Sequence, residues 1–242
     1  MIRACWVLIM LIVPLFGGEA TPAPVRYGID RDGYRVTVDV ALPRLTADQR
    51  RPIETRFLAR LPGFVAGMDV ADWVKDNYTT MINEMSRGQA EFPGAASFTG
   101  WYHESVISTS WYGGDLLSLH AEHNSYSGGV HPGCRHEALL FDSETMKPVT
   151  LADLIAPADQ DAFATLLIER WKQTNHLLPD ARPSEHGLFK DELPPALPLI
   201  TAAGIEVIYS PYEVAPWSTG TVRITLTRDQ ARPFLRRDPW GK

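Results

Sequence analysis

The strongest constraint on this chain is a glycine-rich stretch between two strand-like runs. It reads Ser125-Tyr126-Ser127-Gly128-Gly129-Val130-His131-Pro132-Gly133. Because glycine reaches positive φ without steric cost and proline fixes φ, this stretch is a loop and not the interior of a strand. We call it a shaped loop, because its glycines and proline determine its backbone conformation. The runs at 116–125 and 135–142, and a third at 98–110, are rich in β-branched and aromatic residues. Three such strands with short connections predict an antiparallel meander.

A second loop of the same kind lies far downstream. It runs from Tyr209 to Gly220 and separates strand-like runs at 205–209 and 222–226. We expect the two loops to meet in space and form one binding surface. Its candidate residues are Tyr126, Ser127, Gly128, Gly129 and His131 from the first loop and Tyr212, Glu213 and Trp217 from the second. Aromatic rings in such loops stack on sugars or anchor protein partners, but they also fill the space beneath long loops.

The N-terminus has the pattern of a secretory signal peptide. Arg3 precedes an apolar run from Cys5 to Phe16, and Gly18-Glu19-Ala20 offers a small-x-small cleavage site. The apolar run is shorter than the roughly 20 residues that cross a membrane. The pattern predicts a signal peptide over residues 1–20, a periplasmic or secreted location, and no stable membrane span.

The rest of the chain predicts an α+β fold in two closely joined subdomains, with antiparallel sheets and helices packed on them. The N-terminal subdomain covers 21–97. Its predicted elements are strands at 25–30 and 34–42, a helix begun by a Thr46–Gln49 capping box, and a helix from Asp69 to Gly88. The second subdomain covers 98–242. Its predicted elements are the meander, an amphipathic helix at 159–174, the two strands around the second loop, and a closing helical turn at 228–235.

Composition limits the choice of partners. The net charge of −6 disfavours nucleic acid and anionic membranes, which require basic patches, and it permits a cationic partner.

Signal cleavage would leave Cys134 as the one cysteine of the mature chain. We expect a half-buried thiol there, with a catalytic thiol near His136 as the alternative.

Catalytic and metal motifs are weak. Five of the seven histidines lie between 103 and 136, but His120 and Glu122 share one face of a strand while His123 points to the other. We therefore expect no metal and no cofactor, and His131 would be the first ligand to consider. Glu213 is the best single acid–base candidate. It lacks an evident carboxylate partner, and a structural role that accepts backbone N–H bonds is favoured.

Three segments resemble a known extracytoplasmic domain. They are YSGGVH at 126–131, LLFDSET and VTLADL at 139–145 and 149–154, and GIEVIYSPYEVAPWSTG at 204–220. In order and spacing they resemble the C-terminal domain, of unknown function, that RsiV-type anti-sigma factors share with PdaC-type peptidoglycan deacetylases. The resemblance covers about 98–227, and the preceding part resembles the small domain that usually comes first. Met146 stands where the family has glycine, and Trp217 where it has tyrosine.

The resemblance implies a function outside the cytoplasm. Neither the sigma-binding segment of the first group nor the deacetylase domain of the second is found in this chain, so only the shared module carries over. In RsiV-type proteins that module binds lysozyme. The prediction is a non-enzymatic binding module for a cell-envelope protein, with a lysozyme-like enzyme as the sharpest version, or for a peptidoglycan glycan. The alternatives are a cell-wall hydrolase or esterase using His131 and Glu213, and loops that only lock the strands.

Overall fold

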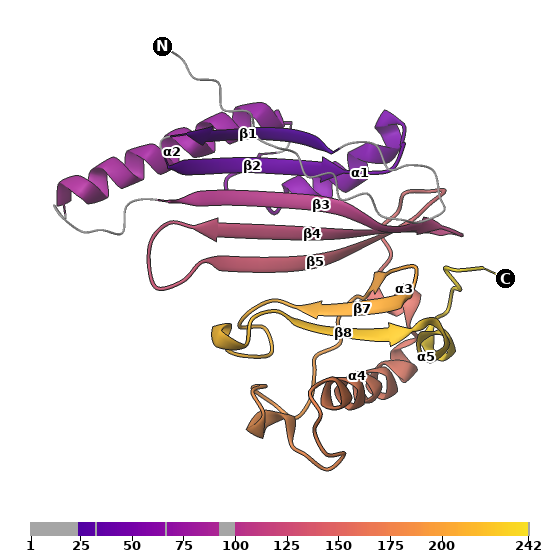
Figure 1. Cartoon of the computed structure of the whole chain (residues 1–242). Coiled ribbons are helices and arrows are strands. Elements are labelled where there is room, and N and C mark those ends of the chain that lie inside the picture. Colours follow the sequence, from indigo (N-terminus) through magenta and orange to yellow (C-terminus); the bar gives the residue numbers. More distant parts are fainter. Residues whose placement is uncertain (1–23, 32, 66, 92–99, 242) are drawn as a thin grey trace.

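The computed structural model describes residues 24–31, 33–65, 67–91 and 100–241, and consists of two β-sheets with helices packed on them (Figure 1). The strands are β1 Val25–Arg31, β2 Tyr34–Ala41, β3 Tyr102–Gly113, β4 Leu116–Tyr126, β5 Gly133–Asp142, β6 Leu199–Ile200, β7 Gly204–Tyr209 and β8 Val222–Thr227. The helices are α1 Ala47–Leu58, α2 Val70–Glu91, α3 Leu151–Leu154, α4 Gln160–Thr174 and α5 Arg228–Ala231. The predicted signal peptide lies outside the described residues.

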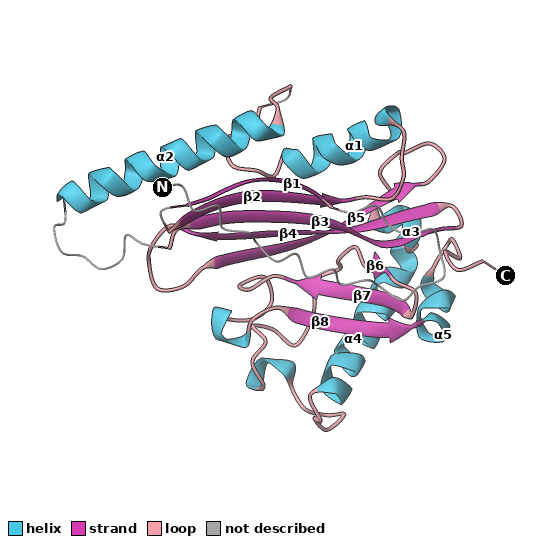
Figure 2. Cartoon of the chain, turned by 45° about the horizontal axis from the view of Figure 1, so that its top comes forward, coloured by secondary structure: helices cyan, strands magenta, loops and turns pink. Residues whose placement is uncertain are grey.

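The α+β class is confirmed. One sheet has five strands in the order β1-β2-β3-β4-β5, and the other has three in the order β6-β7-β8. Helices α1 and α2 cover one face of the five-stranded sheet, and α4 lies against the three-stranded sheet (Figure 2). Within the described residues, no helix combines the length and the apolar character that a membrane crossing requires.

One strand pair departs from the antiparallel expectation. The β3–β4 and β4–β5 pairs are antiparallel, as the meander predicts, whereas β2 and β3 are parallel. Helices α1 and α2 lie between β2 and β3 in the chain and return it to the end of the sheet where β2 began. Such a crossover is what joins parallel neighbours.

Local signals begin α1 and α2 where the sequence predicts. The side chain of Thr46 accepts a hydrogen bond from the backbone N–H of Gln49, and the Gln49 side chain accepts one from the N–H of Thr46, which completes the capping box. Asp69 accepts a bond from the N–H of Ala71 at 2.7 Å. The predicted end of α2 at Gly88 is wrong, because the helix continues to Glu91. Gly88 does not have the positive φ of a helix-terminating glycine.

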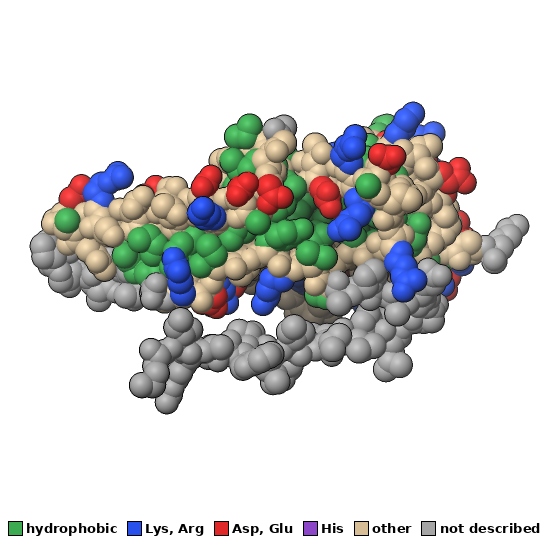
Figure 3. Space-filling model, turned by 90° about the horizontal axis from the view of Figure 1, so that it is seen from above, with side chains coloured by type: hydrophobic (Ala, Val, Ile, Leu, Met, Phe, Trp, Pro, Cys, Tyr) green, Lys and Arg blue, Asp and Glu red, His purple; other side chains and the backbone are tan. Residues whose placement is uncertain are grey.

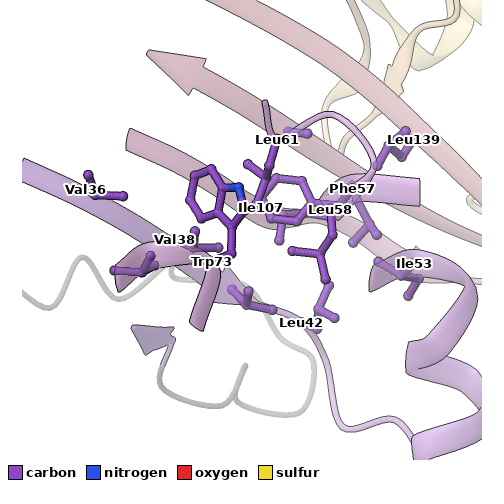
Figure 4. Packing of buried hydrophobic residues seen from close by; sticks show 14 of the residues in the cluster. Val36, Val38, Leu42, Ile53, Phe57, Leu58, Leu61, Trp73, Ile107 and Leu139 are labelled. Atoms are coloured by element: carbon purple, nitrogen blue, oxygen red, sulfur yellow. The ribbon is translucent and has the colours of Figure 1, made fainter. Parts of the chain in front are cut away.

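The first core lies between the five-stranded sheet and the two helices. Figure 4 shows the ring of Trp73 among side chains from the sheet and from α1. Val36, Val38, Ile53 and Phe57 are at most 1% exposed. The alternation along β2 thus places its apolar side chains on the face that α1 and α2 cover.

The second core joins the three-stranded sheet to the other face of the meander. It includes Leu116 and Leu140 from the meander, Phe163 from α4 and Tyr209 from β7. A buried hydrogen bond from the N–H of Ile200 to Oγ of Ser118, 2.9 Å long, ties β6 to β4. Because the five-stranded sheet takes strands from both sides of residue 97, the predicted boundary between the subdomains falls inside one sheet. The division into domains stays a prediction.

Candidate functional site

The two shaped loops contact each other directly. The Nε2 atom of His131 lies 2.9 Å from the phenolic oxygen of Tyr212. The imidazole also stacks on the indole of Trp217, with ring centroids 4.4 Å apart and an interplanar angle of 14°. The Nε1–H of Trp217 donates to the carbonyl of Pro132 at 3.1 Å. Residues that are far apart in the sequence therefore form one structural unit.

The first loop is shaped by its glycines. Gly128 and Gly129 have φ values of 91° and 105°, which residues other than glycine rarely adopt. The hydroxyl of Tyr126 donates to the carbonyl of Gly129 at 3.1 Å and closes the loop on itself. Ser127 is exposed, and Val130 is 99% exposed at the tip.

The second loop holds Tyr212 in an unusual conformation. Tyr212 has a φ of 70°, and its N–H donates to the carbonyl of Ala215 at 2.9 Å. The Oε2 atom of Glu213 accepts a hydrogen bond from the N–H of Ser210 at 2.9 Å, the structural role favoured for this carboxylate. Glu213 thus stabilises the turn to which it belongs. Among the described residues, no hydrogen bond or ion pair joins it to His131, the partner required by the hydrolase alternative.

We define the loop patch as Val130, His131, Tyr212 and Trp217. Tyr212 is 58% exposed and Trp217 is 37% exposed. Their polar atoms are held by the contacts described above, so the rings are fixed although they face solvent. Rigid, amphipathic rings of this kind suit a binding surface.

A second cluster lies on the face of the meander that carries the second core. Glu122 of β4 lies directly opposite His136 of β5, and His120 is two residues away on the same face of β4. His120 Nε2 is 3.1 Å from His136 Nδ1, which is 3.8 Å from Glu122 Oε2. One nitrogen or oxygen from each side chain lies within 4.8 Å of the others. We call these three residues the histidine cluster.

Sequence reasoning missed this cluster because it considered one strand at a time. His123 does point to the opposite face, where it bonds Ser105 and stacks on Phe57. The third member is instead His136, from the next strand. The hairpin register would have revealed it, since a loop closing between Ser125 and Gly133 places Glu122 opposite His136. His131, the first ligand considered, belongs to the loop patch and not to this cluster.

Cys134 is a free, half-buried thiol, as predicted. Its Sγ atom lies 3.3 Å from His136 Nε2. Burial, and to a smaller extent the charge of Glu122, raise the pKa of the Cys134 thiol. A catalytic cysteine requires the opposite shift, because the thiolate is the nucleophile. The burial of Cys134 therefore favours the structural interpretation of this thiol.

A cavity of about 300 Å³ opens on the side of the sheet that α1 and α2 cover. His103 and His123 line it together with Arg60, Trp73 and Arg135. Burial lowers the pKa of both histidines below the ordinary value of 6.5. The smaller effects come from Glu84 on His103, and from Glu137, Arg135, Arg60 and Glu122 on His123.

These histidines predict a loss of stability in acid. An unfolded chain binds protons at both histidines as pH falls below about 6.5, whereas the folded chain resists protonation until lower pH. The contribution of these histidines to the free energy of unfolding is therefore fully present above about pH 6.5. It decreases as the pH falls from there toward the lower pKa that the histidines have in the folded chain. Urea unfolding at several pH values should show this, and His103→Gln should reduce the slope. The exposed His186→Gln is the control; equal slopes for His103→Gln and the parent protein would contradict the prediction.

The motif at 139–154 has a structural explanation. The Oδ1 atom of Asp142 accepts hydrogen bonds from the N–H and hydroxyl of Thr145 at 2.9 and 2.8 Å, and these bonds lower the pKa of Asp142 to about 2. Thr150 and Asp153 form a capping box that begins α3. Met146 has a φ of 54°, a conformation that glycine adopts more readily than other residues do. These residues shape the turn after β5 and lie outside the loop patch.

Comparison with known proteins agrees with this architecture. A family model described as a protein of unknown function, DUF3298, matches residues 152–229, from α3 to α5. A solved DUF3298 family member from Bacteroides fragilis NCTC 9343 is 18% identical with a TM-score of 0.68, covering 90% of this chain and 93% of that one. A DUF3298 family protein from Pseudomonas aeruginosa PAO1 is 17% identical with a TM-score of 0.62, covering 91% and 96%. No curated protein matches the chain. The chain is thus similar in fold to DUF3298 family structures, and a segment of its C-terminal half matches the DUF3298 family model.

Proposed function

We propose that this protein is a non-enzymatic binding module that acts outside the cytoplasm, and that its loop patch binds a basic, lysozyme-like enzyme of the cell envelope. The observation that carries the proposal is the fixed and exposed set of rings at the meeting of the two loops. The resemblance to the RsiV-type and PdaC-type module suggests the partner. The location rests on the signal-peptide pattern at 1–20.

The backbone of Tyr212 supports a functional role for the patch. A residue other than glycine in the left-handed region costs about 1–2 kcal/mol. Tyr212 is exposed at this position, and its ring is held by His131 on the neighbouring loop. Strained and exposed residues gather at ligand-binding positions, because elsewhere an unstrained residue would serve the fold better.

The form and charge of the molecule suit a protein partner. The cavity beneath α1 and α2 is lined by other residues, whereas Val130 and Tyr212 of the loop patch are 99% and 58% exposed. Tyrosine and tryptophan are frequent at the centres of protein interfaces. On the face seen in Figure 3, acidic and basic side chains are interspersed and do not gather into a basic patch. The net charge of −6 would favour the approach of a basic enzyme.

Calorimetric titration with a purified c-type lysozyme, and separately with muropeptides, tests the proposal. We expect lysozyme binding that weakens with salt, and Trp217→Ala should weaken it about 30-fold or more, the loss typical of a central interface residue. Tyr112→Ala is the matched control, since Tyr112 is an exposed aromatic residue in β3 outside the patch. Muropeptide binding alone would select the glycan alternative, and no binding to either would overturn the proposal.

A Tyr212→Asn variant separates a binding role from a structural one. Asparagine enters the left-handed region more readily than tyrosine does, so the free energy of unfolding should stay within about 1 kcal/mol of the parent value. Binding should weaken as the phenol ring is lost. If the loops only lock the strands, the variant will instead unfold more easily and bind as the parent protein does.

The enzymatic alternative has its own test. A hydrolase using His131 and Glu213 would release soluble fragments from purified peptidoglycan, and His131→Ala would abolish the release. The Glu213 contact with the N–H of Ser210 favours the non-enzymatic role. We expect no release by the purified protein, and release that depends on His131 would contradict the proposal.

A further inference from the structure

We propose that the histidine cluster of His120, Glu122 and His136 is a binding site for a divalent transition metal of the zinc class. The site is distinct from the loop patch and goes beyond the proposed function. It is built on paired strands, β4 and β5, whose register fixes the three positions. Sites on regular elements hold ligand geometry more accurately than sites on loops.

The spacing of the donor atoms fits a tetrahedral ion. Zinc bonds to nitrogen and oxygen are about 2.0–2.2 Å long, so two ligand atoms in a tetrahedral site lie roughly 3.3 Å apart. His120 Nε2 and His136 Nδ1 are 3.1 Å apart, and His136 Nδ1 and Glu122 Oε2 are 3.8 Å apart. Small rotations of the side chains would place one ion between all three atoms.

The second contacts of two of the ligands also fit. His136 Nε2 lies 3.0 Å from the hydroxyl of Thr221, and an N–H bond to that oxygen would leave Nδ1 unprotonated and free to ligate. Asn124 donates to Oε1 of Glu122 at 2.6 Å, which leaves Oε2 directed toward His136. Hydrogen-bonded ligands of this kind are typical of protein metal sites.

The charge state of the cluster favours a cation. His120 and His136 supply imidazole nitrogens, which ligate metal in their neutral form. Glu122 supplies a negative charge. Arg223 carries a positive charge near His136 that would repel a cation, but its guanidinium pairs with Glu206 at 3.2 Å.

Two imidazoles and one carboxylate suit zinc, copper or nickel, and not magnesium or calcium, which take oxygen ligands. Three protein ligands leave the fourth tetrahedral position for water. The N–H of His136 donates to Ser210 Oγ at 3.0 Å, and Thr221 is the last residue before β8. One metal ligand, His136, therefore contacts residues at both ends of the second loop.

The test is titration of chelator-treated purified protein with zinc chloride in a calorimeter. We expect one ion per chain, a higher melting temperature with zinc, and visible absorption bands of tetrahedral cobalt(II) when cobalt replaces zinc. His120→Gln and His136→Gln should each weaken zinc binding at least 100-fold and lose the cobalt bands. Asn124→Ala should weaken binding about 10-fold, as outer-shell substitutions do.

Two controls complete the design. His186→Gln removes an exposed histidine and should bind zinc as the parent protein does, which excludes a general effect of imidazole number. Cys134→Ser should leave the cobalt spectrum unchanged, since Sγ contacts the Nε2 side of His136 and is not a ligand of the proposed site. Melting temperatures without metal show whether each variant is folded. Absence of one-to-one zinc binding in the parent protein, or parent-like binding by folded His120→Gln and His136→Gln, would overturn the site.

Discussion

Replacing Gly204 with alanine should destabilise the protein by about 3–5 kcal/mol, the sum of a strained backbone and an overpacked core. Gly204 begins β7 with a φ of 153°, a conformation that other residues rarely adopt. It is buried opposite Thr227 of β8, and an added Cβ would lie 2.8 Å from the Thr227 carbonyl carbon and closer still to the Leu226 oxygen. Neither backbone atom can move without breaking the β7–β8 pairing.

Urea unfolding of Gly204→Ala measures this effect. The matched control is Gly33→Ala, because Gly33 also has positive φ, 79°, but has nothing within 4 Å of an added Cβ. The control should lose only the backbone component, about 1–2 kcal/mol. Equal losses in the two variants would show that the close approach of β8 contributes nothing.

Replacing Phe57 with alanine should cost a similar amount in the first core. The ring is 1% exposed and stacks on His123, with centroids 5.3 Å apart and an interplanar angle of 23°. Removing a buried phenylalanine side chain typically costs about 3–5 kcal/mol, because transfer energy is lost and a cavity remains. The same cavity would open beside His123 and admit water to it.

The control for this substitution is Phe189→Ala. Phe189 is 52% exposed, so the same chemical change should alter the free energy of unfolding by only about 0.5 kcal/mol. Denaturation curves of the two variants at pH 7.5 make the comparison. A loss below about 1 kcal/mol for Phe57→Ala would mean that the first core tolerates the cavity and is less closely packed than the burial indicates.

Local features of the fold could be predicted because local residues determine them. The capping box at Thr46, the alternation along β2 and the shaped loop after β4 each depend on neighbours in the sequence. The contact between the two loops was also expected, since both connect strands and both concentrate proline, glycine and aromatic residues. The binding role of their residues stays a proposal.

Features set by strand pairing could not be predicted in the same way. Alternation shows which face of β2 is buried, but it does not show that β3 is its parallel neighbour. The histidine cluster was missed for a related reason, because Glu122 and His136 meet through the register of two strands. The prediction that α2 ends at Gly88 was wrong for another reason. A single glycine in a helix interior costs only about 1 kcal/mol, and tertiary packing easily offsets this cost.

The parallel neighbours β2 and β3 also decide how far the protein can be dissected. A fragment beginning near residue 98 would keep the meander and the second core but would leave β3 as an unprotected edge strand. Its main-chain N–H and C=O groups would be available to other copies of the fragment, the usual route to edge-to-edge aggregation. The β1–β2 hairpin thus shields the rest of the molecule from self-association, in addition to its part in the first core.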